Sequence, residues 1–232
     1  MASLDLLCLA NSRKYGNRCI AGLRMDGGGW VRPVSRLEDG SLPAPQIRLS
    51  DGSAPRMLDV LRVPVGQPMP KPHHPEDVAI EPGTWSLVSR PCDWDVMVRL
   101  LRKVLVREPV LLGSNWDRIP YPSAGQGFGA SLAAVSATDL KWSIVTSQQG
   151  TRQTRAVFTL ATQCYDLAVT DDGWERRLSY LQHGLHPLAA GGIGDGERVI
   201  LIVSLGEPFE GYCYKLVAGV LVVNPTTRTA WG

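Results

Sequence analysis

Residues 4–23 read LDLLCLANSRKYGNRCIAGL, and this stretch decides the fold expected for the amino-terminal half. An apolar run at residues 4–10 is followed by a polar loop at residues 11–17 and by a second apolar run at residues 19–23. Short apolar runs on either side of a polar loop predict two strands joined by a turn. Asp26-Gly27-Gly28-Gly29 then supplies glycines for another turn, and Trp30-Val31-Arg32-Pro33-Val34 reads as a short strand. We therefore predict a three-stranded meander for residues 1–35.

The remainder of the first half is rich in proline and glycine and contains fewer regular elements. We predict strands at residues 58–65, 77–80 and 85–88. Asp93 is placed to cap a helix whose apolar residues fall on one stripe, and Glu108-Pro109 would end that helix. Residues 113–129 are rich in Gly, Pro and Ser and mark a boundary. The predicted modules are therefore residues 1–112 and 113–232, with the C-terminal strand pair packing across both.

The second half contains further short strands, which we predict at residues 142–146, 156–160, 164–170 and 199–205, and one helix at residues 174–183. Its carboxyl end repeats a motif of the amino end. Arg18-Cys19-Ile20-Ala21-Gly22 resembles Lys215-Leu216-Val217-Ala218-Gly219, and both follow an apolar strand and a polar loop. This similarity indicates a duplication. Short strands, many glycines and few helices favour a mainly β fold made of two small β-barrels.

Composition indicates an ordinary globular protein, with 44% hydrophobic and 20% charged residues. The five cysteines are widely spaced and several lie in apolar runs, so we expect free thiols in a reducing compartment. The first ten residues lack a basic segment, and no apolar stretch is long enough to span a membrane. We therefore predict a cytoplasmic protein without membrane contact. No ligand spacing points to a metal, because His73-His74 has no further ligands nearby in the sequence, and no cofactor is predicted.

The formal net charge is only +2, which argues against a uniformly basic nucleic-acid binder. The charge is unevenly distributed, however. Between residues 13 and 36 Lys and Arg outnumber the one acid, Asp26, and between residues 141 and 155 Lys141, Arg152 and Arg155 are accompanied by no acid. Two local basic patches are therefore compatible with a near-neutral sum.

Several segments together resemble the bacterial family of dual OB-domain proteins. They are Cys8-Leu9-Ala10-Asn11-Ser12-Arg13-Lys14, Arg18-Cys19-Ile20-Ala21-Gly22, Trp30-Val31-Arg32-Pro33-Val34-Ser35, His74-Pro75-Glu76-Asp77, Tyr165-Asp166-Leu167-Ala168-Val169-Thr170-Asp171 and Tyr214-Lys215-Leu216-Val217-Ala218-Gly219. The resemblance implies two tandem OB-like small β-barrel modules. It suggests nucleic-acid binding by analogy of fold, although a fold does not by itself determine a function.

The candidate binding residues combine cations, amides, hydroxyls and aromatic rings, which suit phosphate contacts and base stacking. They are Asn11, Ser12, Arg13, Lys14, Tyr15, Arg18, Trp30, Arg32, Lys141, Trp142, Arg152, Arg155 and Lys215. The alternatives are that the first loop is a solvated turn, that Trp30 closes a barrel core and that the second patch is a solvated basic face. No catalytic residue is predicted.

Three functions are compatible with this pattern. The first is a nucleic-acid-binding protein, with single-stranded DNA or RNA favoured and a protein partner possible, and with recognition rather than catalysis as its role. The second is a sensor of a nucleotide or modified base, bound in a pocket between the modules. The third is a metal-dependent enzyme that uses the carboxylates of Asp166, Asp171 and Glu207. The third is least favoured, because carboxylates at these positions ordinarily form turns and caps.

Overall fold

The first barrel begins with a long antiparallel hairpin. The computed structural model describes residues 2–124, 129–147 and 149–223. In it β1 (Ala2–Lys14) pairs with β2 (Asn17–Arg24) around a turn at Tyr15 and Gly16, both of which have positive φ. β3 (Trp30–Val34) pairs with β2 and completes the predicted meander.

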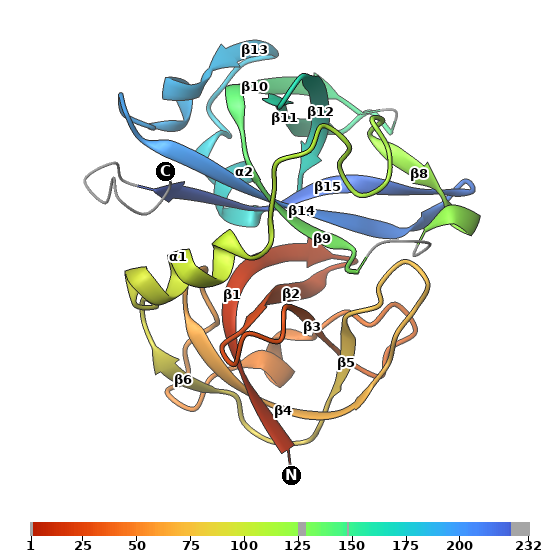
Figure 1. Ribbon diagram of the computed structural model, residues 1–232, viewed down its shortest axis with the longest axis vertical. Coiled ribbons are helices and arrows are strands. Elements are labelled where there is room, and N and C mark those ends of the chain that lie inside the picture. Colours follow the sequence, from red (N-terminus) through yellow and green to blue (C-terminus); the bar gives the residue numbers. More distant parts are fainter. Residues whose placement is uncertain (1, 125–128, 148, 224–232) are drawn as a thin grey trace.

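Three more strands complete the first sheet. They are β4 (Val60–Pro68), β5 (Asp77–Ile80) and β6 (Ser86–Ser89), and a short 3-10 helix, η1 (Ala44–Ile47), precedes β4. The strand order is β1-β2-β3-β5-β4-β6, β3 and β5 are parallel, and an additional β1–β4 pairing closes a five-stranded barrel. The predicted mainly β, OB-like fold is therefore confirmed (Figure 1).

The second barrel is built on one nine-stranded sheet with the order β13-β10-β11-β12-β15-β14-β9-β7, and β8 pairs with β15. The strands are β7 (Leu105–Val106), β8 (Arg118–Pro120), β9 (Leu132–Ser136), β10 (Thr138–Thr146), β11 (Arg152–Leu160), β12 (Gln163–Val169), β13 (Gly184–Pro187), β14 (Arg198–Phe209) and β15 (Tyr212–Val223). Only Ala137 separates β9 from β10 in the sequence. The strand order from β10 through β11, β12, β15 and β14 to β9 therefore ends on the same segment of chain on which it begins, which closes the barrel. β12 and β15 are parallel, as β3 and β5 are in the first barrel.

The internal repeat therefore differs from the one expected. The sequence comparison matched the β1–β2 hairpin with the β14–β15 hairpin. In the strand order, β1 and β2 are the first two strands of their barrel, whereas β14 and β15 come after β10, β11 and β12 in theirs. The first two strands of the second barrel are the β9–β10 segment and β11. The two segments with the short Ala-Gly similarity therefore occupy different positions in the strand orders of the two barrels.

Both helices are shorter than predicted. α1 (Trp94–Arg102) is capped by Asp93 as expected, but it ends early because residues 105 and 106 form β7 and pair with β9. α2 (Asp172–Arg177) is capped by Asp171 and ends before the expected residue 183. The short 3-10 helices η2 (Tyr121–Ser123) and η3 (Leu188–Gly191) lie in loops. No helix among the described residues is long and apolar enough to cross a membrane.

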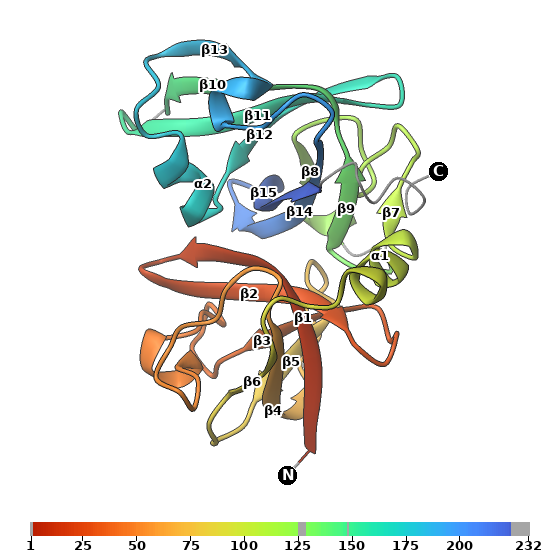
Figure 2. The ribbon, with the colours of Figure 1, turned by 90° about the vertical axis from the view of Figure 1, so that its left-hand side faces the viewer.

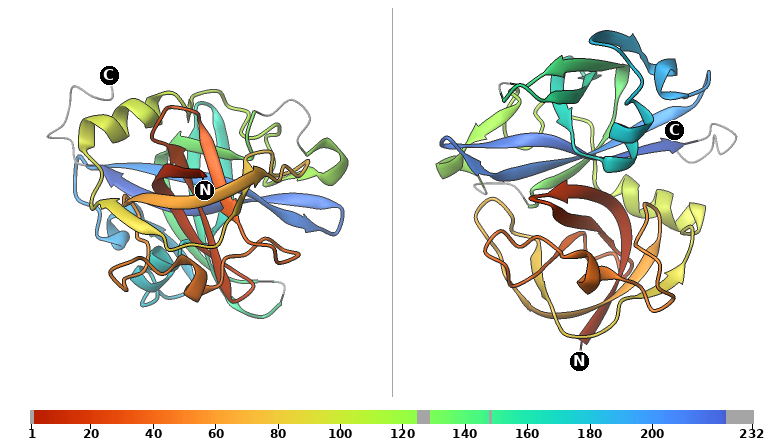
Figure 3. Two further views of the ribbon diagram at one scale, coloured as in Figure 1. Left: turned by 90° about the horizontal axis from the view of Figure 1, so that it is seen from below. Right: turned by 180° about the vertical axis from the view of Figure 1, so that it is seen from behind.

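The two barrels pack through an apolar interface. A shared core combines Leu7 and Leu9 of β1 with Ile202 of β14 and Ala218 of β15, and α1 covers one end of it (Figure 2). Glycine at position 219 permits the approach, because a Cβ there would collide with the backbone of Leu9. The view from behind shows β1 lying against the β14–β15 hairpin (Figure 3). The predicted junction near residue 112 lies between β7 and β8, both of which join the second sheet, and the module boundary stays a prediction.

Candidate functional site

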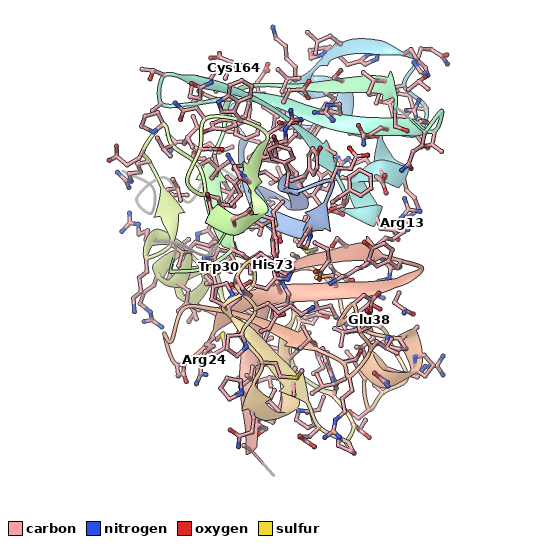
Figure 4. The ribbon with its side chains drawn as sticks, turned by 90° about the vertical axis from the view of Figure 1, so that its right-hand side faces the viewer. Arg13, Arg24, Trp30, Glu38, His73 and Cys164 are labelled. Carbon is pink, nitrogen blue, oxygen red and sulfur yellow. The ribbon has the colours of Figure 1, made fainter. Side chains whose placement is uncertain are left out.

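The β1–β2 hairpin, the loop at residues 69–76 between β4 and β5, and the β14–β15 hairpin meet at the boundary between the barrels, which we call the seam. Figure 4 shows Arg13 and His73 at this boundary. Loops between strands one and two and between strands four and five are the ligand-binding loops of OB barrels. In the first barrel, both loops contact the second barrel, since Lys14 and His73 both contact Glu207 of β14. The seam therefore contains the surfaces on which a ligand of the first barrel would be expected.

Arg32 is the central cation of the seam. It lies on β3 and is 1% exposed. Its Nη2 lies 3.0 Å from Glu76 Oε1 and donates hydrogen bonds to the hydroxyls of Ser131 (2.9 Å) and Ser204 (3.0 Å), which belong to the other barrel. Its Nε has no partner among the described residues. Arg32 therefore joins the two barrels and retains one buried free donor.

Glu207, near the end of β14, is the central acid of the seam. Its Oε1 accepts a hydrogen bond from Lys14 Nζ (2.7 Å), and Lys71 Nζ lies 3.7 Å from the same oxygen. Its Oε2 lies 2.8 Å from His73 Nε2. Burial alone would raise the pKa of Glu207, but the hydrogen bonds from His73 and Lys14 bring that pKa well below its usual range. Glu207 is therefore a carboxylate at neutral pH.

Burial shifts the pKa of two neighbouring groups strongly. Desolvation raises the pKa of Asp77 to about 7, although Arg32 opposes this shift. Desolvation and the charge of Arg32 lower the pKa of His74 to about 2, so its imidazole is neutral. Such perturbed groups gather at functional sites and also in structural networks, so the surrounding geometry must decide between these roles.

A cavity of about 210 Å³ opens at the seam. We call it the inter-barrel cavity. Polar and charged side chains occupy part of its wall, and apolar residues such as Leu132 and Leu216 form the rest. The residues that line it are Ala10, Ser12, Arg13, Lys14, Tyr15, Cys19, Ala21, Arg32, His74, Leu132, Thr170, Ser204, Leu205, Gly206, Glu207, Leu216 and Ala218. Several of the segments that carry the family resemblance therefore meet at this cavity.

A second cavity of about 510 Å³ also has the β1–β2 hairpin as a wall. We call it the arginine pocket, because Arg18, Arg48, Arg56 and Arg176 line it. Arg18 and Arg176 both pair with Asp172 of the second barrel. Arg48 and Arg56 are exposed, and neither forms an ion pair within the described part of the chain. The pocket therefore offers two cations that pair with no carboxylate of the residues that the structure describes.

The exposed end of the β1–β2 hairpin carries three of the predicted binding residues. Arg13 pairs with Glu175 and lies 3.4 Å from Asp172, and its side chain is still 58% exposed. Tyr15 is 76% exposed at the turn. Arg18 Nη2 lies 3.1 Å from Asp172 Oδ2 and is partly accessible. The structure brings these three residues together at the seam. The two cations among them, Arg13 and Arg18, form ion pairs with carboxylates of the second barrel.

Three other predicted residues of the first half are more enclosed. Asn11 donates to the Pro55 carbonyl (2.9 Å) and lines the arginine pocket. Ser12 is buried and forms a β-bridge with Asp171. Trp30 is half-buried and packs against the core shared by the barrels. Trp30 and Arg32 thus do not present a common open surface, because Arg32 is fully enclosed.

The second-half patch is divided between two faces of β10. Lys141 is exposed, whereas the next residue, Trp142, is 0% exposed and stacks on Trp174 with ring centroids 5.1 Å apart. Successive strand residues point to opposite faces, so Lys141 and Trp142 cannot grip one ligand. The alternation of the sequence already contained this signal, since Leu140, Trp142 and Ile144 are all apolar and all buried.

The remaining predicted cations are occupied within the protein. Arg152 donates to the Leu178 carbonyl (2.9 Å), and Arg155 pairs with Asp166 (2.7 Å). Lys215 is 2% exposed and donates to the Ser114 carbonyl (2.8 Å), while burial lowers its pKa to about 8. These contacts are structural and lie away from the two cavities of the seam.

The three carboxylates of the enzyme alternative serve separate purposes. Asp166 pairs with Arg155. Asp171 caps α2 by accepting a hydrogen bond from the Gly173 amide, and it accepts another from the Val220 amide of β15. Glu207 belongs to the seam. The three carboxylates therefore do not form one cluster. Asp166 and Asp171 have structural roles, and only Glu207 lies at the candidate site.

All five cysteines are free, as predicted, although Cys164 is exposed. Sequence reasoning missed Arg48, Arg56 and Arg176 as candidate site residues, and it set His73-His74 aside. Arg48 and Arg56 lie in an irregular stretch without periodicity, so nothing local indicated where their side chains point. They join the site only through the packing of the barrels.

Comparison with known proteins identifies the fold family. A model described as "Dual OB-containing domain" matches residues 4–220. No match was found among curated proteins. Similar solved structures include a murine DNA binding protein bound with ds DNA, at 7% identity over 97% of this chain and 100% of that chain with a TM-score of 0.32. Another is the tetrameric p202 HIN2, at 8% identity over 96% of this chain and 92% of that chain with a TM-score of 0.28. Likenesses this weak carry no argument about function.

Proposed function

Because the chain belongs to the family of dual OB-containing domains, we propose that it binds nucleic acid, with the arginine pocket of the seam as the site for backbone phosphates. OB barrels commonly bind oligonucleotides on the surface around their strand-one-to-two and strand-four-to-five loops. The observation that supports the proposal most directly is the pair Arg48 and Arg56. Both are exposed, both line the pocket, and neither is neutralised by a carboxylate among the described residues.

The chemistry of the pocket suits a phosphodiester. A guanidinium presents several donors in one plane and matches the oxygens of a phosphate. Arg18 and Arg176 add cationic edges to the same pocket, although Asp172 shares their charge. The near-neutral net charge of the whole chain is compatible with this site, because only the local cluster faces the ligand.

Tyr15 is an exposed aromatic residue at the turn between β1 and β2, and β2 also carries Arg18 of the arginine pocket. The positive φ of 48° at Tyr15 belongs to the tight turn of the hairpin, which leaves the ring 76% exposed. Exposed aromatic rings next to a cationic groove stack the bases of single strands with little regard to sequence. We propose that a single strand bound in the arginine pocket continues along the β1–β2 hairpin to this ring, so single-stranded DNA or RNA is the favoured ligand.

Fluorescence anisotropy with labelled single-stranded and double-stranded DNA and RNA at several salt concentrations tests the proposal. In the variant Arg48→Ala/Arg56→Ala we expect affinity to fall about tenfold and the slope of log K against log salt to become shallower by about 1.4, or about 0.7 for each lost phosphate contact. The matched control is Arg99→Ala/Arg102→Ala, which removes two exposed cations of α1. Equal losses in both variants, or no binding by the wild type, would contradict the proposal.

A second candidate function is recognition of a single nucleotide or modified base in the inter-barrel cavity. The observation that favours it is the buried Nε of Arg32, which has no partner among the described residues and belongs to a residue that lines this cavity of about 210 Å³. Isothermal titration with mononucleotides and modified bases tests it. Binding that depends little on salt and persists in Arg48→Ala/Arg56→Ala would favour the cavity, whereas a steep salt dependence would favour the polymer.

A further inference from the structure

His73, His74 and Glu207 form a compact cluster at the seam, and two of its members, His74 and Glu207, also line the inter-barrel cavity. One nitrogen from each histidine and one oxygen from Glu207 all lie within 4.8 Å of one another. His73 and His74 are 4% and 3% exposed. The cluster is assembled across the seam, because the histidines belong to the loop between β4 and β5 and Glu207 belongs to β14.

The surroundings of His74 select its tautomer. Its Nε2 lies 2.9 Å from the Leu205 carbonyl oxygen, which can only accept, so the ring proton is on Nε2. Its Nδ1 therefore carries a lone pair. That nitrogen has no hydrogen-bond partner among the described residues and lies 3.7 Å from Glu207 Oε1 and 3.9 Å from Asp77 Oδ2. A histidine whose second nitrogen donates to a backbone carbonyl is in the arrangement typical of metal ligands.

His73 is held beside His74 in a similar way. Its Nε2 lies 2.8 Å from Glu207 Oε2, and its Nδ1 has no partner in the described part of the chain. The two imidazole rings lie 4.3 Å apart, and the ring of Tyr121 contacts His73 edge-on at 5.6 Å. The histidine pair is therefore fixed by packing, and one possible ligand atom from each of the three residues lies within 4.8 Å of the other two.

In the absence of a metal, the hydrogen bond from His73 and a nearby cation stabilise the carboxylate of Glu207 beside the lone pair of His74 Nδ1. Lys14 provides one positive charge, because its Nζ is 2.7 Å from Glu207 Oε1. Lys71 lies farther away, at 3.7 Å from the same oxygen. Lys14 is next to the exposed turn residue Tyr15, so its flexible side chain can rotate outward into solvent. The ammonium thus occupies a place that a metal ion could take.

We propose that His73, His74 and Glu207 bind a divalent transition-metal ion, with Lys14 as the cation that occupies the site when the metal is absent. Two imidazoles and a carboxylate suit Zn²⁺, with Co²⁺ as a spectroscopic substitute. Asp77 is positioned to be an additional oxygen ligand, since its Oδ2 lies 3.9 Å from His74 Nδ1. The site is independent of nucleic-acid binding and can be tested without any nucleic acid.

The test is equilibrium dialysis of the chelator-treated full chain against ZnCl₂ alone, followed by metal analysis, with the visible spectrum of bound Co²⁺ as a second readout. We expect one ion per chain in the wild type. Glu207→Gln should weaken binding by about 10-fold to 100-fold, as the loss of a ligand's charge or support typically does. Lys14→Met should strengthen binding, because the competing ammonium is removed.

The matched control is His183→Ala/His186→Ala, which removes the other two histidines of the chain and lies outside the cluster. It should retain one bound ion. Circular dichroism verifies that each variant is folded, and Lys14→Met keeps the test decisive if Glu207→Gln does not fold. The proposal is overturned by the absence of stoichiometric metal in both wild type and Lys14→Met, or by loss of the ion only in the His183 and His186 control.

Discussion

The two cavities beside the β1–β2 hairpin both contain cations, but the protein uses these cations differently. In the inter-barrel cavity, Arg32 and Lys14 are surrounded by carboxylates and hydroxyls of the chain itself. In the arginine pocket, Arg48 and Arg56 are exposed and pair with no carboxylate that the structure describes. Cations of the first kind stabilise the packing of the barrels, whereas those of the second kind can bind an external anion. The candidate interface is therefore identified by the cations that are exposed and unpaired among the described residues, and not by the number of Lys and Arg residues in the sequence.

The largest expected effect of this difference is on stability. Arg32→Ala leaves the buried carboxylate of Glu76 without its cation, and breaking such a buried pair costs about 3–5 kcal/mol in the free energy of unfolding. Arg48→Ala should change that free energy by less than about 0.5 kcal/mol, since it removes an exposed side chain. Guanidinium unfolding of both variants measures the difference. Similar values for the two would remove the distinction between the cavities.

A smaller effect is expected on binding at the hairpin turn. Tyr15→Ala should weaken the affinity for single strands about tenfold, because stacking of one base on an aromatic ring contributes about 1–3 kcal/mol. The salt dependence should stay unchanged, since no charge is lost. Tyr180→Ala is the control, because Tyr180 is also strongly exposed, at 65%, and lines neither cavity. Anisotropy titrations in which Tyr180→Ala loses as much affinity would argue against a stacking role for Tyr15.

Local pattern was enough to predict much of the fold. The apolar runs around residues 11–17 predicted the β1–β2 hairpin, and Asp93 predicted the cap of the first helix. These features depend on neighbours in the sequence. The helix ends were wrong where a distant strand determined them, as β9 does for the residues after α1.

The site depends on contacts that local pattern does not encode. Glu207 and His73 are 134 residues apart in the sequence, and only the docking of the barrels brings them together. The same docking encloses Arg32, which in the sequence looked like an accessible cation next to Trp30. Charge and residue type therefore identified chemically useful groups, but their orientation required the tertiary structure. A cytoplasmic location and a protein partner stay predictions.

The smallest effect predicted for the seam is a pH dependence centred on Asp77. Burial raises the pKa of this carboxyl from 3.8 to about 7 in the folded chain. Between these values the unfolded chain releases the proton while the folded chain keeps it, so the contribution of Asp77 to stability falls as the pH rises. One proton over one pH unit corresponds to about 1.4 kcal/mol, so the free energy of unfolding should lose about 1 kcal/mol from this group between pH 5 and pH 6.

Asp77→Asn cannot ionise and therefore should lack this loss, so the variant should gain stability relative to the wild type as the pH rises from 5 to 6. Urea unfolding of both proteins at the two pH values measures the difference, with Asp51→Asn as the control, because Asp51 is exposed and its pKa is lowered by hydrogen bonds from Ser53. Parallel pH profiles for wild type and Asp77→Asn would show that Arg32 keeps Asp77 ionised. In that case the buried cation of the inter-barrel cavity is fully neutralised at every physiological pH, and the contrast with the unpaired arginines of the second cavity becomes sharper.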